Sequence, residues 1–72
     1  MSASRHGTVE MARDAAYRRA RRMPDGVAWY SDHALQKWRV QAWMVGRRWV
    51  YSEVADFHVL PVVDRFCSWV EP

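Results

Sequence analysis

Apolar residues recur with helical spacing at the start of the chain, over residues 8–23, TVEMARDAAYRRARRM. Thr8 is a favourable N-cap residue, acids occupy the early turns and arginines the last turns, which suits the helix dipole. Residues 24–26, PDG, form a turn that ends the helix. The pattern predicts a helix whose apolar stripe consists mostly of small residues, namely Val9, Ala12, Ala16, Ala20 and Met23.

The centre of the chain changes to a period of two. Residues 37–42 alternate strictly between polar and apolar, and valine and aromatic residues are enriched around them. Gly46 stands where a hairpin needs its turn. Residues 27–30, VAWY, also have the composition of a strand. We therefore predict a three-stranded antiparallel meander over residues 27–54.

A helix is the alternative for the same central segment. Apolar residues also recur there at helical spacing, in the stripe Leu35, Trp38, Ala42, Val45 and Trp49. Gly46 interrupts that stripe, which favours the hairpin. The alternative fold is a three-helix all-α domain with a middle helix over residues 31–45.

A hairpin loop of two or four residues centred on Gly46 and Arg47 fixes the strand register. The predicted pairs are Met44 with Trp49, Ala42 with Tyr51, and Val40 with Glu53. One face then carries Trp38, Val40, Ala42, Met44, Trp49 and Tyr51, and the other carries Arg39, Gln41, Trp43, Val50, Ser52 and Val54. We expect Trp38 and Trp49 in the core and Trp43 at the surface as a binding anchor.

Residues 61–70, PVVDRFCSWV, return to helical spacing, and Pro61 suits a first helical turn. The sequence thus predicts an α+β fold: a small single domain over residues 1–72, with an N-terminal helix, the three-stranded antiparallel meander and a C-terminal helix on one sheet face. Residues 1–7 are expected to form a flexible N-terminal tail.

Charge divides the chain into two unlike parts. Residues 1–23 hold six arginines against two acids, a net charge of +4, whereas residues 24–72 hold five basic and six acidic residues, a net charge of −1. The second part also holds nine of the ten aromatic residues. A domain of 72 residues cannot enclose all ten rings, so some of them are expected to serve as surface anchors.

No catalytic, metal or nucleotide motif stands out, and we predict a protein that is not an enzyme and uses no cofactor. Ser31, Asp32 and His33 are consecutive, so their side chains diverge and form a turn rather than a catalytic triad. Cys67 is expected to be a buried free thiol, which with the lack of a secretory signal favours the cytoplasm. The histidines have no metal-ligand spacing, and no segment is apolar enough for a membrane.

The aromatic and arginine residues expected at the surface indicate a binding function. Tryptophan, tyrosine and arginine are enriched at binding hot spots, so we predict a non-catalytic regulator, inhibitor or adaptor that docks on a larger protein or complex. Ten arginines against one lysine, with no isoleucine or asparagine, indicate a GC-rich genome. For a compact one-domain protein without motifs from such a genome, we expect a phage or plasmid gene in a bacterium. A DNA- or RNA-binding protein is the alternative, and a homodimer is left open. The candidate partner-binding residues are Arg18, Arg21, Arg22, Arg39, Trp43, Arg47 and Arg48.

Overall fold

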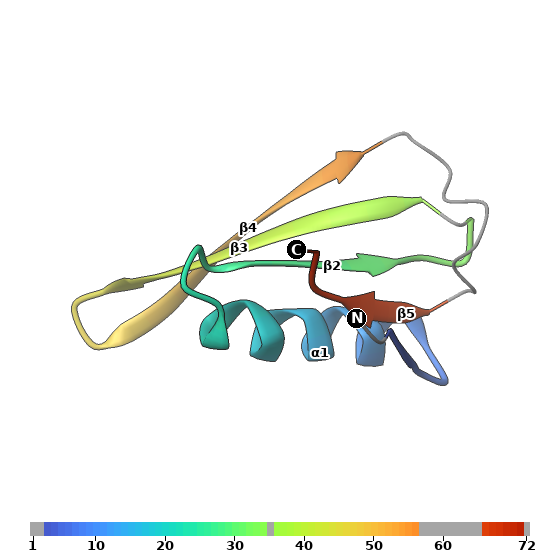
Figure 1. The fold of residues 1–72 in the computed structure, drawn as a ribbon, viewed down its shortest axis with the longest axis horizontal. Coiled ribbons are helices and arrows are strands. Elements are labelled where there is room, and N and C mark those ends of the chain that lie inside the picture. Colours follow the sequence, from blue (N-terminus) through green and yellow to red (C-terminus); the bar gives the residue numbers. More distant parts are fainter. Residues whose placement is uncertain (1–2, 35, 57–65, 72) are drawn as a thin grey trace.

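A computed structural model of the chain describes residues 3–34, 36–56 and 66–71. In these residues one helix packs on one face of a five-stranded antiparallel sheet (Figure 1). The strands lie in the order β1 (Ser4–Arg5), β5 (Cys67–Trp69), β2 (Val27–Ser31), β3 (Lys37–Val45) and β4 (Arg48–Asp56). The α+β class and the single domain are confirmed, whereas the number of strands exceeds the predicted three and the all-α alternative is wrong.

Helix α1, Val9–Arg22, begins and ends almost as the sequence predicts. The Thr8 hydroxyl accepts a hydrogen bond of 3.2 Å from the backbone N–H of Met11, which satisfies one of the free donors of the first turn. Extended backbone at Met23 ends the helix, and the chain turns at Gly26 into the sheet. The predicted small-residue stripe is confirmed, since Ala12, Ala16 and Ala20 are all fully buried.

The central meander consists of β2, Val27–Ser31, β3, Lys37–Val45, and β4, Arg48–Asp56. The pairs of Met44 with Trp49, Ala42 with Tyr51 and Val40 with Glu53 all form as predicted. Gly46 has φ +61° and begins a two-residue turn, because a type II′ hairpin needs positive φ at its first central residue.

The predicted second helix over residues 61–70 is wrong for the part that the structure describes. Cys67–Trp69 form strand β5 between β2 and β1, and residues 61–65 lie outside the described residues. Phe66 has φ +57°, a left-handed conformation that interrupts a helix. Pairing with a strand on each side outweighs the helical spacing of so short a segment.

The N-terminal residues also differ from the flexible tail that the sequence suggests. Ser4–Arg5 form strand β1, which pairs antiparallel with β5 at the edge of the sheet. The backbone N–H of His6 donates a 2.9 Å hydrogen bond to the carbonyl of Phe66 and extends this pairing. The two-residue strand is therefore held by a segment from the far end of the chain.

The core lies between α1 and strands β2, β3 and β5. Three helix alanines meet Ala28 and Val40 of the sheet, both of which are fully buried, so the helix lies close to the strands. Tyr17, Trp38 and Tyr51 close the sides of this core as partly buried rings. The expected core position of Trp38 is thus confirmed in part.

The β3–β4 hairpin extends past the end of the helix (Figure 1). A helix of 14 residues spans about 21 Å, whereas strands of nine residues span about 30 Å, so part of the hairpin must remain uncovered. Trp49 lies in this overhang and keeps 39% of its surface exposed. The expectation that Trp49 belongs to the core is wrong, although its predicted sheet face is right.

Candidate functional site

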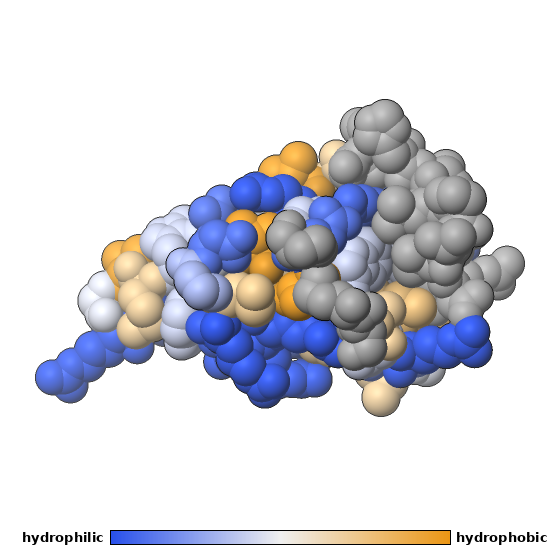
Figure 2. Space-filling model, in the orientation of Figure 1, coloured by the Kyte–Doolittle hydropathy of each residue, from blue (hydrophilic) through white to orange (hydrophobic). Residues whose placement is uncertain are grey.

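The overhanging end of the hairpin gathers large apolar side chains at the surface. We define the hairpin tip as residues 43–49, which include the turn. Its exposed apolar residues are Trp43 (43%), Met44 (48%), Val45 (56%) and Trp49 (39%). Figure 2 shows apolar residues on this end of the hairpin and a hydrophilic surface over α1. Because a small domain rarely leaves such a group uncovered without use, the hairpin tip is the leading candidate for a binding surface.

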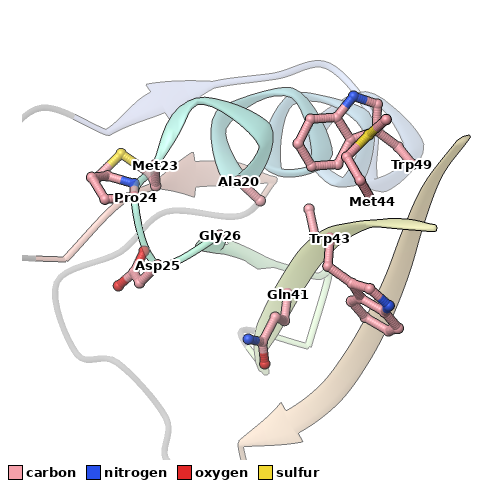
Figure 3. Close-up of a pocket in the computed structure, with 10 residues that line it drawn as sticks. Ala20, Met23, Pro24, Asp25, Gly26, Gln41, Trp43, Met44 and Trp49 are labelled. Carbon is pink, nitrogen blue, oxygen red and sulfur yellow. The ribbon is translucent and has the colours of Figure 1, made fainter. Parts of the chain in front are cut away.

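A hollow of about 350 Å³ opens where the hairpin leaves the helix. Its walls come from the end of α1, the turn into β2 and the hairpin, and include Ala20, Met23, Met44 and Trp49. Met44 and Trp49 lie side by side on the helix side of the sheet, and Trp43 points away from them (Figure 3). The hairpin tip therefore offers apolar groups on both of its faces, and one face has a recess beside it.

The structure distributes the candidate arginines over three places. Arg18, Arg21 and Arg22 are exposed on α1, and Arg47 and Arg48 are exposed at the hairpin tip. Val40 and Ala42 pack in the core on the helix side of the sheet. Their neighbours in the strand, Arg39 and Trp43, therefore lie on the opposite face. Arg39, Trp43 and Arg48 thus share a face with one another and not with the helix arginines.

A cluster around Glu53 joins the helix to the central strand β2 and the edge strand β4. The Glu53 carboxylate accepts hydrogen bonds from Arg13 Nε at 2.8 Å, from the Tyr17 hydroxyl at 2.6 Å and from the Tyr30 hydroxyl. Arg13 also donates to the Tyr17 hydroxyl at 2.9 Å, and the Tyr17 ring stacks on Tyr51 with centroids 4.1 Å apart. Every polar group of this cluster has a partner within it.

These contacts shift the titration of the cluster. Burial acts to raise the pKa of Glu53, but the hydrogen bonds from Arg13, Tyr17 and Tyr30 outweigh it and lower the pKa below its usual range. Burial and the hydrogen bond to Glu53 raise the pKa of Tyr17 to about 12, and the same causes raise the pKa of Tyr30. The carboxylate is therefore charged and both phenols are neutral near neutral pH, as a structural ion pair requires.

A second polar cluster contains serine and histidine but does not expose a nucleophile. His6 Nε2 lies 2.8 Å from Ser68 Oγ, and Arg19 Nε donates to the same hydroxyl at 3.2 Å. Arg19 also donates to Ser4 Oγ. Ser68 is fully buried, so a substrate cannot reach its hydroxyl. The cluster joins α1 to strands β1 and β5.

The turn that the sequence predicts over residues 31–33 is made by Asp32, whereas Ser31 is the last residue of strand β2. Asp32 Oδ1 accepts hydrogen bonds from the backbone N–H groups of Ala34 and Gln36 at 2.9 and 3.0 Å. Asp32 Oδ2 accepts one from Trp38 Nε1 at 3.0 Å. Burial opposes ionisation here, yet these three donors lower the pKa of Asp32.

Cys67 is buried, as expected, and the chain has no second cysteine for an internal disulfide; it lies in a strand and not in a helix. Among the described residues, no group of three or more histidine, cysteine and acidic side chains could hold a metal ion. None of the helices in the described part of the chain has the length and apolarity to cross a bilayer. No protein-family model, curated protein or solved structure matches the chain.

Sequence reasoning identified Trp43 at the hairpin tip but missed Met44, Val45 and Trp49 as exposed residues. A comparison of lengths could have found them, because the predicted 16-residue helix is shorter than the predicted hairpin strands are long. The Glu53 cluster was also missed. Its signal is weak, since Arg13 and Tyr17 of the helix meet Tyr30 and Glu53, which are distant in sequence, only after the helix packs on the sheet.

Proposed function

We propose that this protein is a non-catalytic regulator, inhibitor or adaptor that docks the hairpin tip on a larger protein. The observation that carries the proposal is the exposure of Trp43, Met44, Val45 and Trp49 on a projecting hairpin. Aromatic and methionine side chains are enriched at the centre of protein interfaces, and a few of them supply most of the binding free energy.

The surroundings of the hairpin tip indicate what its partner should present. Arg47 and Arg48 flank the apolar residues and would complement acidic side chains on the partner. The 350 Å³ hollow beside Met44 and Trp49 has room for one apolar side chain of the partner. We therefore expect an apolar contact region with an acidic rim, in which methionine adapts to the shape of the partner.

DNA or RNA binding is the second candidate. The observation in its favour is that Arg18, Arg21 and Arg22 are all exposed on one helix, where they could contact successive phosphates. Trp43 lies on the opposite side of the sheet, so it could not stack on a base that these arginines hold. This candidate therefore relies on charge alone, which makes the protein partner the better supported of the two.

A capture experiment with a matched pair of variants tests the proposal. The immobilised protein is incubated with lysate of its native host, with and without nuclease, and bound proteins are quantified. Met44→Asp should weaken capture of a specific partner about 30-fold, because it places a charge in the apolar contact, a loss of about 2 kcal/mol. Met11→Asp is the control, since Met11 is 55% exposed on α1, away from the hairpin.

Equal capture by the wild type and Met44→Asp would contradict docking by the hairpin tip. Loss of all capture on nuclease treatment would instead support the nucleic-acid candidate. In that case, replacing Arg18, Arg21 and Arg22 together should flatten the salt dependence of oligonucleotide binding by about one unit of log–log slope per lost phosphate contact.

A further inference from the structure

Strand β4 forms one edge of the sheet, and its edge differs from the opposite one. β1 at the other edge has two residues, whereas β4 has nine, Arg48–Asp56, paired with β3 in an unbroken register. Natural proteins protect long edges with charged residues, proline or bulges, and β4 contains neither proline nor a bulge, although it carries the charged residues Arg48, Glu53 and Asp56. Among the described residues, no strand pairs with its outer side. The edge is a ready template for another strand.

The hydrogen-bond pattern shows which residues of β4 face outward. The N–H of Ala42 donates to the carbonyl of Gly26 on the β2 side, so residues 38, 40 and 42 of β3 bond toward β2. Odd residues of β3 therefore bond to even residues of β4, such as Trp43 to Val50. The backbone N–H and C=O groups of residues 49, 51, 53 and 55 are left directed to the open edge.

The sequence of β4, RWVYSEVAD, is complementary to itself when reversed. An antiparallel pair centred on Ser52 sets Arg48 opposite Asp56 and Val50 opposite Val54 of a second copy. The same register joins the outward-facing residues in hydrogen-bonded pairs, Tyr51 with Glu53 and Trp49 with Ala55. Opposite charges stand at both ends and valines face each other between them, and each of these cross-strand pairs is favourable.

Neighbouring registers lose this match. A shift of the centre to Glu53 sets two carboxylates opposite each other, which is destabilising. A shift to Tyr51 sets Trp49 opposite Glu53, sets Arg48 opposite Val54 and leaves Asp56 without a paired residue. Only the register centred on Ser52 uses all nine residues and pairs the charges.

We propose that β4 is the interface of a symmetric homodimer, in which two copies join at Ser52 into one continuous antiparallel sheet. The two-fold axis is perpendicular to the sheet, so both helices lie on the same face. The hairpin tips then project from opposite ends of the dimer. The dimer uses the edge of β4, which shares Arg48 and Trp49 with the hairpin tip, but its centre at Ser52 lies outside the tip, so the two proposals can be tested separately.

Cysteine crosslinking tests the register directly in the full chain. In the proposed dimer the two copies of residue 52 form a non-hydrogen-bonded pair with Cα atoms about 4.5 Å apart, within disulfide range. The two copies of residue 54 lie roughly 13 Å apart, which is out of range. Mild oxidation should therefore crosslink Ser52→Cys at least about tenfold more than Val54→Cys, whose parent side chain is 57% exposed on the same face.

A charge-swap experiment gives a second readout that a misfolded variant could not imitate. Ser52→Lys and Ser52→Glu should each sediment as monomers, because like charges meet on the axis, and an equimolar mixture should form a heterodimer. A monomeric wild type at high concentration, equal crosslinking of the two cysteine variants, or a dimer of Ser52→Lys alone would each overturn the proposal.

Discussion

At the scale of single residues, two glycines adopt positive φ in very different surroundings. Gly26 has φ +72°, and a Cβ atom there would lie 2.4 Å from the carbonyl oxygen of Ala42. Gly46 has φ +61°, and a Cβ atom there would meet nothing within 4 Å. A residue with a side chain would be strained by the positive φ at either position. Only at Gly26 do two backbone segments also approach closely, and there the backbone N–H of Ala42 donates a 2.7 Å hydrogen bond to the carbonyl of Gly26.

The two alanine substitutions should therefore separate these effects. Gly46→Ala should lower the free energy of unfolding by about 1 kcal/mol, the cost of a left-handed alanine. Gly26→Ala should cost about 3 kcal/mol or more, because its Cβ atom also forces β2 and β3 apart. Urea denaturation followed by tryptophan fluorescence measures both values. Equal losses would show that the close approach at Gly26 contributes nothing.

At the scale of the elements, small side chains set the distance between helix and sheet. Ala12, Ala16 and Ala20 are fully buried against a sheet surface that includes Ala28 and Val40. Such contacts bury little area per residue, but they leave no room for a larger side chain. The distance between α1 and the sheet thus depends on the small side chains along this stripe of the helix.

Ala16→Leu should consequently destabilise the protein, even though leucine is a good helix former and more apolar than alanine. The extra atoms would lift the helix from the sheet at a cost of about 2 to 3 kcal/mol. Arg21→Leu, an exposed change on the same helix, should alter stability by less than about 0.5 kcal/mol. Thermal unfolding measures both variants. A gain in stability for Ala16→Leu would mean that the helix has space above the sheet.

At the scale of the whole molecule, the Glu53 cluster should make global stability depend on pH. The folded pKa of Glu53 is lower than the ordinary value of 4.5, so the unfolded chain takes up a proton first as the pH falls. The stabilisation is complete above 4.5 and is lost as the pH falls through the folded pKa. Because the cluster joins α1 to β2 and β4, its loss should lower the free energy of unfolding of the whole domain.

Glu53→Gln should lower the free energy of unfolding by about 1.5 to 3 kcal/mol at neutral pH, since it removes a charged acceptor of three hydrogen bonds. The difference from the wild type should narrow in acid, once the pH has fallen through the lowered folded pKa of Glu53. Urea denaturation at neutral and acidic pH checks this. A difference that does not change with pH would assign the loss to packing and not to charge.

The sequence predicts the parts of this fold that depend on local rules. The cap at Thr8, the alanine stripe, the turn at Gly46 and the register it sets all follow from short-range chemistry. Strand β5 could not be predicted in the same way, because Cys67–Trp69 become a strand only through partners at distant positions. The arginine candidates followed from residue type, whereas their division between two faces depends on how the helix lies on the sheet.

The insertion of β5 between β1 and β2 has a consequence for the order of assembly. α1 and the meander join segments that are adjacent in the chain, so they can form early at a low cost in loop-closure entropy. The contact of His6 with Ser68 spans 62 residues and must close most of the chain. In the described sheet β1 pairs with β5 alone, so it joins the sheet either after β5 has docked on β2 or together with β5. We therefore expect the first strand in the sequence to enter the sheet late, with or after β5.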